Sequence, residues 1–268
     1  MTLVLDGKKI AETIYHRLRP SVAQLKKKGI VPCLAVVLVN SNPESRIFVE
    51  QKVKEGKKLG VLVRVFRLSK KVAPATIERT IARLNKDEEI DGIVIQLPLP
   101  SHLDTDRILN LVKKKKDVDG LTKNSPYPSP CATGILRILD FYKIDFKNQK
   151  VVIVGKGRLV GRPLLRLFQM RGVKAMAVHP FASNFKTVLA QADLIIGGAS
   201  KKGIILPQMV KKNAIVIDAA KNCHPDVKMK VKAMTPSLGG VGPVTVATLL
   251  ENVIYSACRR AKMSPINS

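Results

Sequence analysis

The sequence lacks the features that mark several protein classes. It contains no tryptophan, its aromatic content is 4%, and its four cysteines are scattered along 268 residues. No C-x-x-C pair occurs and no histidine lies at ligand spacing from a cysteine, so we expect reduced, mostly buried thiols and no metal site. No apolar run approaches the length of a membrane span, and the N-terminus lacks a signal-peptide core. We therefore expect a cytoplasmic protein with no membrane partner.

Acidic residues are also scarce, because 20 of them stand against 47 lysines and arginines and the net charge is +27. A charge of this size raises the hypothesis of nucleic-acid binding. The lysines, however, occur in short runs along the whole chain, and side chains that could stack on bases are few. These runs lie at residues 26–28, 57–58, 113–116, 201–202 and 211–212. A solvated basic surface is the favoured interpretation, with nucleic acid not expected as a partner, and such a surface would attract polyanionic small molecules.

What the chain does contain is an alternation of apolar, strand-like runs and amphipathic helical patterns. The predicted helices cover residues 9–28, 44–59, 75–84, 105–112, 134–142 and 244–262, with a further helix beginning near Pro163. The predicted strands cover residues 32–39, 61–68, 92–96, 151–154, 173–178, 194–197 and 214–217. Strands that alternate with helices in this way predict parallel sheets in an α/β fold.

A proline-rich stretch divides the pattern. Three prolines within residues 124–132 predict a linker between two α/β domains. The first domain would comprise residues 1–126 and be completed by the C-terminal helix of residues 245–268. The second would comprise residues 127–244, and a ligand would bind in a cleft between the two.

The most informative stretch is residues 151–165, which read V-V-I-V-G-K-G-R-L-V-G-R-P-L-L. Four apolar residues suit a strand buried on both faces, and Gly155, Gly157 and Gly161 then precede a helical pattern. This arrangement aims free backbone N–H groups at a phosphate, and a Cβ in the turn would hold a pyrophosphate away. The spacing is one residue longer than the usual dinucleotide fingerprint, so a tight turn without a ligand is the alternative.

Charges around this turn indicate which dinucleotide it would bind. An NAD site usually has Asp or Glu at the end of the following strand, whereas here that strand ends at His179 with no acid nearby. Lys156 and Arg158 lie within the turn itself. Cations without a carboxylate favour a 2′-phosphate and therefore NADP, although both side chains could instead be solvated loop charges.

Candidate catalytic residues lie in three segments of the N-terminal half. Ser45, Phe48 and Lys52 follow an i, i+3, i+7 spacing and share one face of a predicted helix. A lysine buried there would have a lowered pKa and could act as a base, or it could be one more surface lysine. Gln96 ends a buried strand, where its amide needs a partner or points into a cleft. Asp119 precedes a glycine, which is also a common turn signal.

Taken together, these segments resemble a known family. The chain carries, in order, S-x-x-F-x-x-x-K, G-I-V-I-Q-L-P-L-P, K-D-V-D-G-L-T, G-K-G-R-L-V-G-R-P and G-G-V-G-P-V-T-V-A-T-L. Their order and spacing closely resemble the FolD-type methylenetetrahydrofolate dehydrogenase/cyclohydrolase family over residues 3–257. Q-L-P-L-P, D-V-D-G and G-G-V-G-P-x-T are highly specific to it in combination.

The resemblance implies two reactions in one-carbon metabolism. Members oxidise 5,10-methylenetetrahydrofolate to the methenyl form with NADP, or NAD in some, and hydrolyse the product to 10-formyltetrahydrofolate, which serves purine biosynthesis. The implied architecture is an N-terminal catalytic domain and a Rossmann-like NAD(P)-binding domain with the substrate in the cleft between them. The implied partners are tetrahydrofolate derivatives and a second copy of the chain, in a homodimer formed through the glycine-loop domains.

The resemblance also implies roles for individual residues. Lys52 matches the base or proton relay of hydrolysis, Gln96 the glutamine that tunes its basicity, and Asp119 the acid that hydrogen-bonds the pterin. The expected substrate contacts are Ser45, Phe48, Lys52, Gln96, Pro98, Asp119, Gly239, Gly240, Pro243 and Thr245. The expected cofactor contacts are Gly155, Lys156, Gly157, Arg158, Gly161, His179, Ser200 and Lys221.

The chain departs from the family pattern near the site. The family tyrosine of the first segment is Phe48 here, which keeps a ring to stack on the pterin but loses the hydroxyl. Lys221 stands where the family has an apolar residue beside the cofactor. Two alternatives therefore stay open: a dehydrogenase with weak or absent cyclohydrolase activity, and a degraded member that binds RNA through its basic surface.

Overall fold

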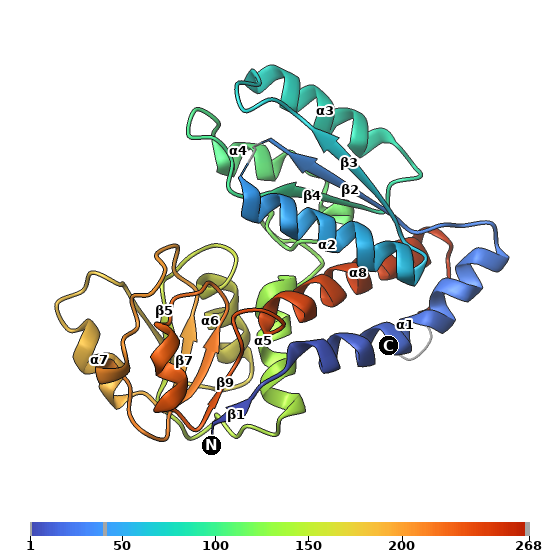
Figure 1. The fold of residues 1–268 in the computed structure, drawn as a ribbon. Helices are drawn as coiled ribbons and strands as arrows, with labels where there is room; N and C mark the ends of the chain where they lie inside the picture. The colour runs from blue at the N-terminus through green and yellow to red at the C-terminus, as the bar shows by residue number, and fades with distance from the viewer. Residues whose placement is uncertain (1, 40–41, 266–268) are drawn as a thin grey trace. The chain divides into compact units, whose positions relative to one another are not determined.

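Helices and strands alternate along the chain in the computed structural model, which describes residues 2–39 and 42–265 (Figure 1). The α-helices are α1 Gly7–Lys27, α2 Pro43–Leu59, α3 Pro74–Lys86, α4 Thr105–Asn110, α5 Pro130–Phe141, α6 Gly161–Met170, α7 Phe185–Gln191 and α8 Val241–Arg260. The strands are β1 Leu3–Val4, β2 Cys33–Leu38, β3 Leu62–Arg67, β4 Gly92–Gln96, β5 Val151–Val154, β6 Ala175–Val178, β7 Leu194–Gly197, β8 Ile215–Asp218 and β9 Ala233–Met234. Short 3-10 helices are η1 Lys114–Lys116, η2 Pro207–Met209 and η3 Pro225–Met229.

The chain divides into two compact units, each with its own parallel sheet, as the α/β pattern predicts. Unit 1 contains Met1–Glu12 and Ser129–Thr245, and unit 2 contains Thr13–Pro128 and Val246–Ser268. The first twelve residues thus belong with the glycine turn rather than with the N-terminal domain in which the sequence places them. The reason is β1, which pairs with β9 in unit 1. A strand of two residues with exposed side chains leaves no periodicity to read.

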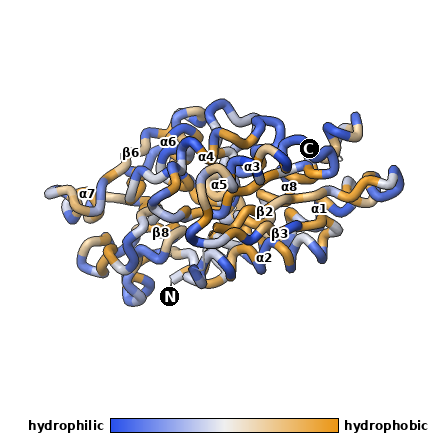
Figure 2. The backbone as a smooth tube through the Cα atoms, turned by 90° about the horizontal axis from the view of Figure 1, so that it is seen from above, coloured by the Kyte–Doolittle hydropathy of each residue, from blue (hydrophilic) through white to orange (hydrophobic). Residues whose placement is uncertain are grey.

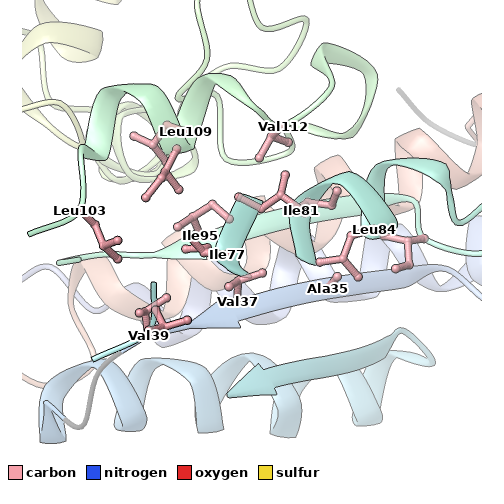
Figure 3. Packing of buried hydrophobic residues seen from close by; sticks show 14 of the residues in the cluster. Ala35, Val37, Val39, Ile77, Ile81, Leu84, Ile95, Leu103, Leu109 and Val112 are labelled. Carbon is pink, nitrogen blue, oxygen red and sulfur yellow. The ribbon is translucent and has the colours of Figure 1, made fainter. Parts of the chain in front are cut away.

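Unit 2 is built on a three-stranded sheet in the order β3-β2-β4, with every pair parallel. All six residues of the central strand β2 are buried, which explains its unbroken apolar run. Apolar side chains of α3 pack against one face of this sheet (Figure 3). Parallel pairing brings the carboxyl ends of β2 and β4 to one edge, and α2 follows β2 from that edge.

The helix α2 carries the lysine singled out in the sequence, and its ends are well specified. The Asn42 side chain accepts a hydrogen bond from the backbone of Glu44 at 2.9 Å, and Pro43 occupies the first helical turn. Gly60, at φ 83°, ends the helix in the left-handed conformation. Hydrophobic and hydrophilic positions alternate along its turns (Figure 2), so that one face packs into unit 2.

Unit 1 is built on a six-stranded sheet in the order β1-β9-β8-β7-β5-β6. All residues of β5, β7 and β8 are buried. After β5 the chain passes to β6 on one side and then returns to β7 on the other side of β5. The strand order therefore reverses at β5, and ligands of open α/β sheets bind outside the carboxyl ends of the strands at such a point.

Several predicted boundaries are wrong. Helix α5 begins at Pro130, inside the expected linker, because proline is favoured in a first helical turn. Helix α8 begins at Val241, three residues before the predicted start at residue 244. Helix α7 and strand β9 were not predicted, since both are short. The sequence also predicts a turn at residues 40–43, and residues 40 and 41 lie outside the described part of the chain. Contrary to expectation, α8 is long and apolar enough to cross a membrane, but 72% of its most apolar window is buried, as in a core helix.

Candidate active site

Two side chains of unit 2 meet where β4 ends beside α2. The Lys52 Nζ donates a hydrogen bond to the Gln96 Oε1 at 2.7 Å, and the Gln96 Nε2 donates to the Leu97 carbonyl at 3.0 Å. The second bond fixes the orientation of the amide, so its oxygen faces the lysine. Lys52 is 8% exposed, although it carries an ionisable group. Lys52 is therefore not a surface lysine, and the Gln96 amide has the partner that the sequence said it needs, because the two side chains are hydrogen-bonded to each other.

Burial shifts the pKa values of Lys52 and Asp119. Desolvation lowers the pKa of Lys52 to about 8, and the attraction of Asp119 opposes this shift only in part. Desolvation raises the pKa of Asp119 to about 6, with Lys52 opposing the shift and the neighbouring Asp117 adding to it. A base and an acid whose pKa values both lie within two units of neutrality are suited to proton transfer.

The turn that carries Asp119 is held by Asp117, a buried residue. Its two carboxylate oxygens accept hydrogen bonds from the backbone of Leu121 at 3.2 Å and of Thr122 at 2.8 Å, and from the Thr122 hydroxyl at 2.7 Å. Gly120 adopts φ 67° within the same turn. Asp117 therefore stabilises the turn, whereas Asp119 interacts electrostatically with Lys52.

The other predicted substrate contacts of unit 2 differ in exposure. Ser45 is buried, and its hydroxyl lies 3.4 Å from the Leu97 carbonyl as donor. Phe48 is 42% exposed on the same helix, so part of its side chain is accessible for stacking. Pro98 is exposed directly after Gln96 and Leu97. We call Ser45, Phe48, Lys52, Gln96 and Asp119 the lysine site.

The glycine turn after β5 has the shape that a pyrophosphate requires. Gly155 adopts φ 89°, and a Cβ there would lie 3.0 Å from the backbone of Ala199. A Cβ on Gly161 would lie 2.2 Å from the Gly155 carbonyl oxygen, so only glycine lets α6 begin this close to β5. Gly157 has no such restriction, with its nearest neighbour at 3.7 Å. Together with the N-terminus of α6, where Val160 supplies no side-chain cap, these residues fit a bound dinucleotide.

Charged and aromatic side chains surround this turn at the carboxyl ends of neighbouring strands. Lys156 is exposed, and Arg158 is partly buried. His179, after β6, is exposed, and its ring centroid lies 5.6 Å from that of Phe181. The Lys201 Nζ lies 5.0 Å from the Phe181 ring centroid. Phe181 is 72% exposed. Neither Phe181 nor Lys201 was among the candidates chosen from the sequence, although an aromatic residue just after β6 was an available signal.

The remaining predicted contacts also belong to unit 1. Ser200 and Lys221 are exposed and follow β7 and β8, and Lys221 adopts φ 58°. Gly239, at φ 87°, accepts a hydrogen bond from the Gly7 backbone at 2.9 Å. Gly240 is packed so closely that a Cβ would lie 2.4 Å from the Pro236 carbonyl oxygen.

Two residues at the start of α8 complete this predicted set. Pro243 is partly exposed. The Thr245 hydroxyl donates to the Val241 carbonyl at 3.0 Å, within α8, which leaves its oxygen lone pairs as acceptors. We call the turn at residues 155–161 together with His179, Ser200 and Lys221 the glycine-loop site.

Thiol and metal chemistry find little support in the described residues. Cys33 and Cys258 are buried, and Cys131 and Cys223 are partly exposed. Burial raises the pKa of the Cys33 thiol to about 11 and also raises that of Cys223, so neither forms a thiolate near neutral pH. Within residues 2–39 and 42–265, no group of three His, Cys, Asp or Glu side chains could hold a metal ion.

Two family models match the chain, and together they cover most of both units. Residues 5–119 match the family described as tetrahydrofolate dehydrogenase/cyclohydrolase, catalytic domain, and residues 129–261 match its NAD(P)-binding domain. The chain is 37% identical over 274 residues to a bifunctional protein FolD of Thermodesulfovibrio yellowstonii, which covers 95% of this chain and 96% of the relative.

Solved structures agree. The crystal structure of a bifunctional FolD enzyme, methylenetetrahydrofolate dehydrogenase/cyclohydrolase, from Campylobacter jejuni superposes with a TM-score of 0.89 at 33% identity, covering 97% of this chain and 100% of that one. The Trypanosoma brucei FolD, complexed with NADP and an inhibitor, superposes with a TM-score of 0.91 at 26% identity, covering 97% and 99%.

Proposed function

The chain belongs to the tetrahydrofolate dehydrogenase/cyclohydrolase family, and from this premise we propose how its residues divide the work of two reactions. The enzyme oxidises 5,10-methylenetetrahydrofolate to 5,10-methenyltetrahydrofolate and hydrolyses the product to 10-formyltetrahydrofolate. The observation that carries the assignment is the 2.7 Å hydrogen bond between the buried Lys52 and the partly buried Gln96, together with an acid whose pKa lies near 6.

In the hydrolysis, Lys52 acts as the base. The methenyl substrate is a cation, so it attracts a nucleophile without help from a strong acid and needs an activated water instead. Neutral Lys52 takes a proton as the water oxygen bonds to the bridging carbon, which discharges the substrate cation. The resulting ammonium returns its proton to N5 as the bond from N5 to that carbon breaks. The hydroxyl on that carbon releases its proton to solvent water as the carbonyl forms, which leaves the formyl group on N10. A substrate cation close by lowers the pKa of Lys52 further and favours its neutral form.

Gln96 and Asp119 position the reactants. The Gln96 oxygen orients the Lys52 nitrogen, and as a neutral acceptor it does not raise the lysine pKa as a carboxylate would. Above its pKa of about 6, the ionised Asp119 accepts hydrogen bonds from the N–H groups of the pterin. The exposed ring of Phe48 stacks on the pterin.

In the oxidation, the residues of unit 1 hold the dinucleotide. Backbone N–H groups of the turn after β5 and of the α6 N-terminus bind its pyrophosphate, because Gly155 and Gly161 leave no Cβ in the way. When bound, the nicotinamide ring accepts the hydride from the methylene carbon of the substrate. The reaction needs no general acid, so these residues serve to orient the ring.

NADP is the proposed cofactor in preference to NAD. No Asp or Glu follows β6, where an NAD enzyme places its ribose-binding acid, and the residues there are His179, Pro180 and Phe181. Lys156, Arg158 and Lys201 supply positive charge around the same strand ends. A 2′-phosphate suits these cations.

The alternatives raised by the sequence are not favoured. Phe48 lacks the family hydroxyl, but the buried Lys52 keeps its hydrogen bond to Gln96 and its electrostatic interaction with Asp119. A degraded RNA-binding member would have no reason to keep them. The proposed setting is the cytoplasm, as a homodimer that supplies 10-formyltetrahydrofolate to purine biosynthesis. The end strand β6 supports self-association, since its Met176 is 51% exposed.

One assay tests both activities and the cofactor. Purified enzyme and 5,10-methylenetetrahydrofolate are mixed with NADP or NAD, and the absorbances of reduced cofactor and of the methenyl product are followed together. We expect reduction with NADP at a higher kcat/KM than with NAD, and methenyl absorbance that decays faster than in buffer. Decay of the methenyl absorbance at the rate seen in buffer would show that the enzyme has no cyclohydrolase activity. A higher kcat/KM with NAD than with NADP would reverse the proposed cofactor preference.

A further inference from the structure

A fully buried asparagine lies behind the glycine-loop site. Asn222 is 0% exposed, and its side chain makes three hydrogen bonds to the segment after β7. Its Oδ1 accepts from the Ala199 backbone at 3.0 Å, and its Nδ2 donates to the carbonyls of Ala199 at 2.9 Å and of Lys201 at 2.6 Å. One side chain thus replaces the partners that residues 199–201 lose when β7 ends.

Asn222 is itself held in place by the carboxylate at the end of β8. The Asp218 Oδ1 accepts from the Asn222 backbone at 2.8 Å, and its Oδ2 accepts from the Cys223 backbone at 2.9 Å. The buried Thr235 hydroxyl accepts from the Asp218 backbone at 2.8 Å. The network therefore joins the carboxyl ends of β7, β8 and β9, the edge at which an open α/β sheet binds its ligand.

A glycine in β7 makes room for this network. A Cβ on Gly197 would lie 2.9 Å from the Asn222 Oδ1 and 3.0 Å from the Asp218 Oδ1. Any other residue at this position would push the asparagine away from the strand. The glycine is thus explained by the side chains that it accommodates.

The segment that Asn222 holds contacts both ends of the glycine-loop site. The backbone and Cβ of Ala199 lie against Gly155, at 3.0 to 3.2 Å from where its Cβ would be. Lys201 extends over the exposed ring of Phe181, beside His179. A shift of residues 199–201 would therefore move the wall of the phosphate turn and the cation beside it at the same time.

We propose that Asn222 is a positioning residue for the dinucleotide: it holds residues 199–201 against the glycine turn, and it acts on the cofactor without touching it. This inference rests on the proposed function of the glycine-loop site. It predicts that losing the side chain weakens cofactor binding and leaves the hydrolysis unchanged, because the lysine site lies in the other unit.

The test is Asn222→Ala in the full chain. We expect the Kd for NADPH, measured by its fluorescence, and the KM for NADP to rise at least about tenfold, as expected when buried hydrogen bonds are lost. The rate of methenyl hydrolysis should stay unchanged. Asn222→Asp keeps the acceptor for Ala199 and loses both donors, so its Kd should also rise.

Two control variants separate positioning from loss of stability. Val210→Ala removes a buried side chain of the same core at a position outside residues 197–201 and 218–223, so it should lower the melting temperature and leave the Kd for NADPH unchanged. Asn252→Ala removes a buried asparagine that donates to the Val118 carbonyl at 2.8 Å in unit 2, and it should also leave that Kd unchanged.

The outcomes are distinct. An unchanged Kd in folded Asn222→Ala overturns the inference, as does an equal rise in Val210→Ala. If Asn222→Ala does not fold, Asn222→Asp decides by the same criterion. Wild-type protein that binds NADPH but never reduces NADP with methylenetetrahydrofolate would refute the proposed function, and a raised Kd in the variants would still support the role of Asn222.

Discussion

At the scale of the residue, the burial of Lys52 makes it a better base and also destabilises the folded protein. Its pKa of about 8 means that roughly a tenth of the molecules carry the neutral base at pH 7, against almost none at an exposed lysine. The same burial destabilises the folded protein wherever the side chain is charged. Below pH 8 Lys52 is protonated in both states, and the folded state bears a desolvation cost of roughly 3 kcal/mol. Between pH 8 and 10.5 only the unfolded state binds the proton, so this cost disappears as pH rises.

The substitution Lys52→Met tests both sides of this argument. We expect it to abolish methenyl hydrolysis, to leave NADPH binding intact, and to raise the free energy of unfolding at pH 7 by about 1–3 kcal/mol. The gain should shrink as the pH is raised from 7 to 9.5 in urea denaturation experiments. In the wild type, kcat/KM of the hydrolysis should rise with pH through about 8, as Lys52 of the free enzyme loses its proton.

Lys54→Met is the matched control, because Lys54 is an exposed lysine of the same helix. It should change neither the hydrolysis rate nor the pH dependence of stability. Hydrolysis at the wild-type rate in Lys52→Met would exclude Lys52 from the mechanism.

At the scale of the element, one buried aspartate fixes the C-terminal part of α8 in unit 2. Asp91, at the start of β4, accepts hydrogen bonds from the Cys33 backbone at 2.9 Å and from the Arg260 Nε and Nη2 at 2.7 and 3.0 Å. Its carbonyl accepts from the Ser256 hydroxyl at 2.7 Å. Removing the carboxylate leaves the buried Cys33 N–H without its acceptor, while Arg260, which is 36% exposed in its side chain, can turn to water.

We therefore expect Asp91→Ala to lower the free energy of unfolding by about 2–4 kcal/mol in urea titrations. The control is Glu89→Ala, which breaks the 2.8 Å pair with Arg64 on the surface of the same unit and should cost no more than about 0.5 kcal/mol. Equal losses from the two variants would contradict the anchoring role of Asp91.

The elements themselves show what the sequence could and could not predict. Strands β4 and β7 match their predicted bounds, because each is a buried apolar run with a clear stop. The boundaries of α5 and α8 were wrong, since proline and glycine near a helix start indicate a loop and a first helical turn equally well. Strand β1 could not be predicted, because two residues form a strand only where β9 offers an edge.

For the site, the sequence indicated which residue types could carry chemistry, but it did not indicate which residues contact one another. A lysine on a partly apolar face and an amide at a strand end made Lys52 and Gln96 candidates, and only the resemblance to a family gave them preference over structural interpretations. Their contact depends on α2 returning to the end of β4, which no local spacing encodes. Asn222 was overlooked because its partners lie 21 to 23 residues away along the chain.

At the scale of the whole molecule, the dominant feature is a net charge of +27. Both ligands of the proposed reactions are anions, since folates carry carboxylates and NADP carries phosphates. A strongly basic protein raises the local concentration of such ligands and speeds their encounter, and salt screens this effect over distances beyond about 8 Å at physiological ionic strength. The charge should therefore act on binding, whereas the proton and hydride transfers, which occur in contact, should be insensitive to it.

The last prediction separates these effects. Raising NaCl from about 20 to about 300 mM should increase the KM for NADP several-fold and leave kcat nearly unchanged, because only the long-range attraction is screened. Sucrose at equal osmolality is the control and should change neither constant. A fall in kcat with an unchanged KM would show that salt acts on the fold or the chemistry instead. The same salt titration also tests the RNA-binding alternative. RNA binding through a diffuse surface charge should disappear as salt is added. An RNA complex that persists at about 300 mM NaCl would require a specific binding site, which the scattered lysines do not predict.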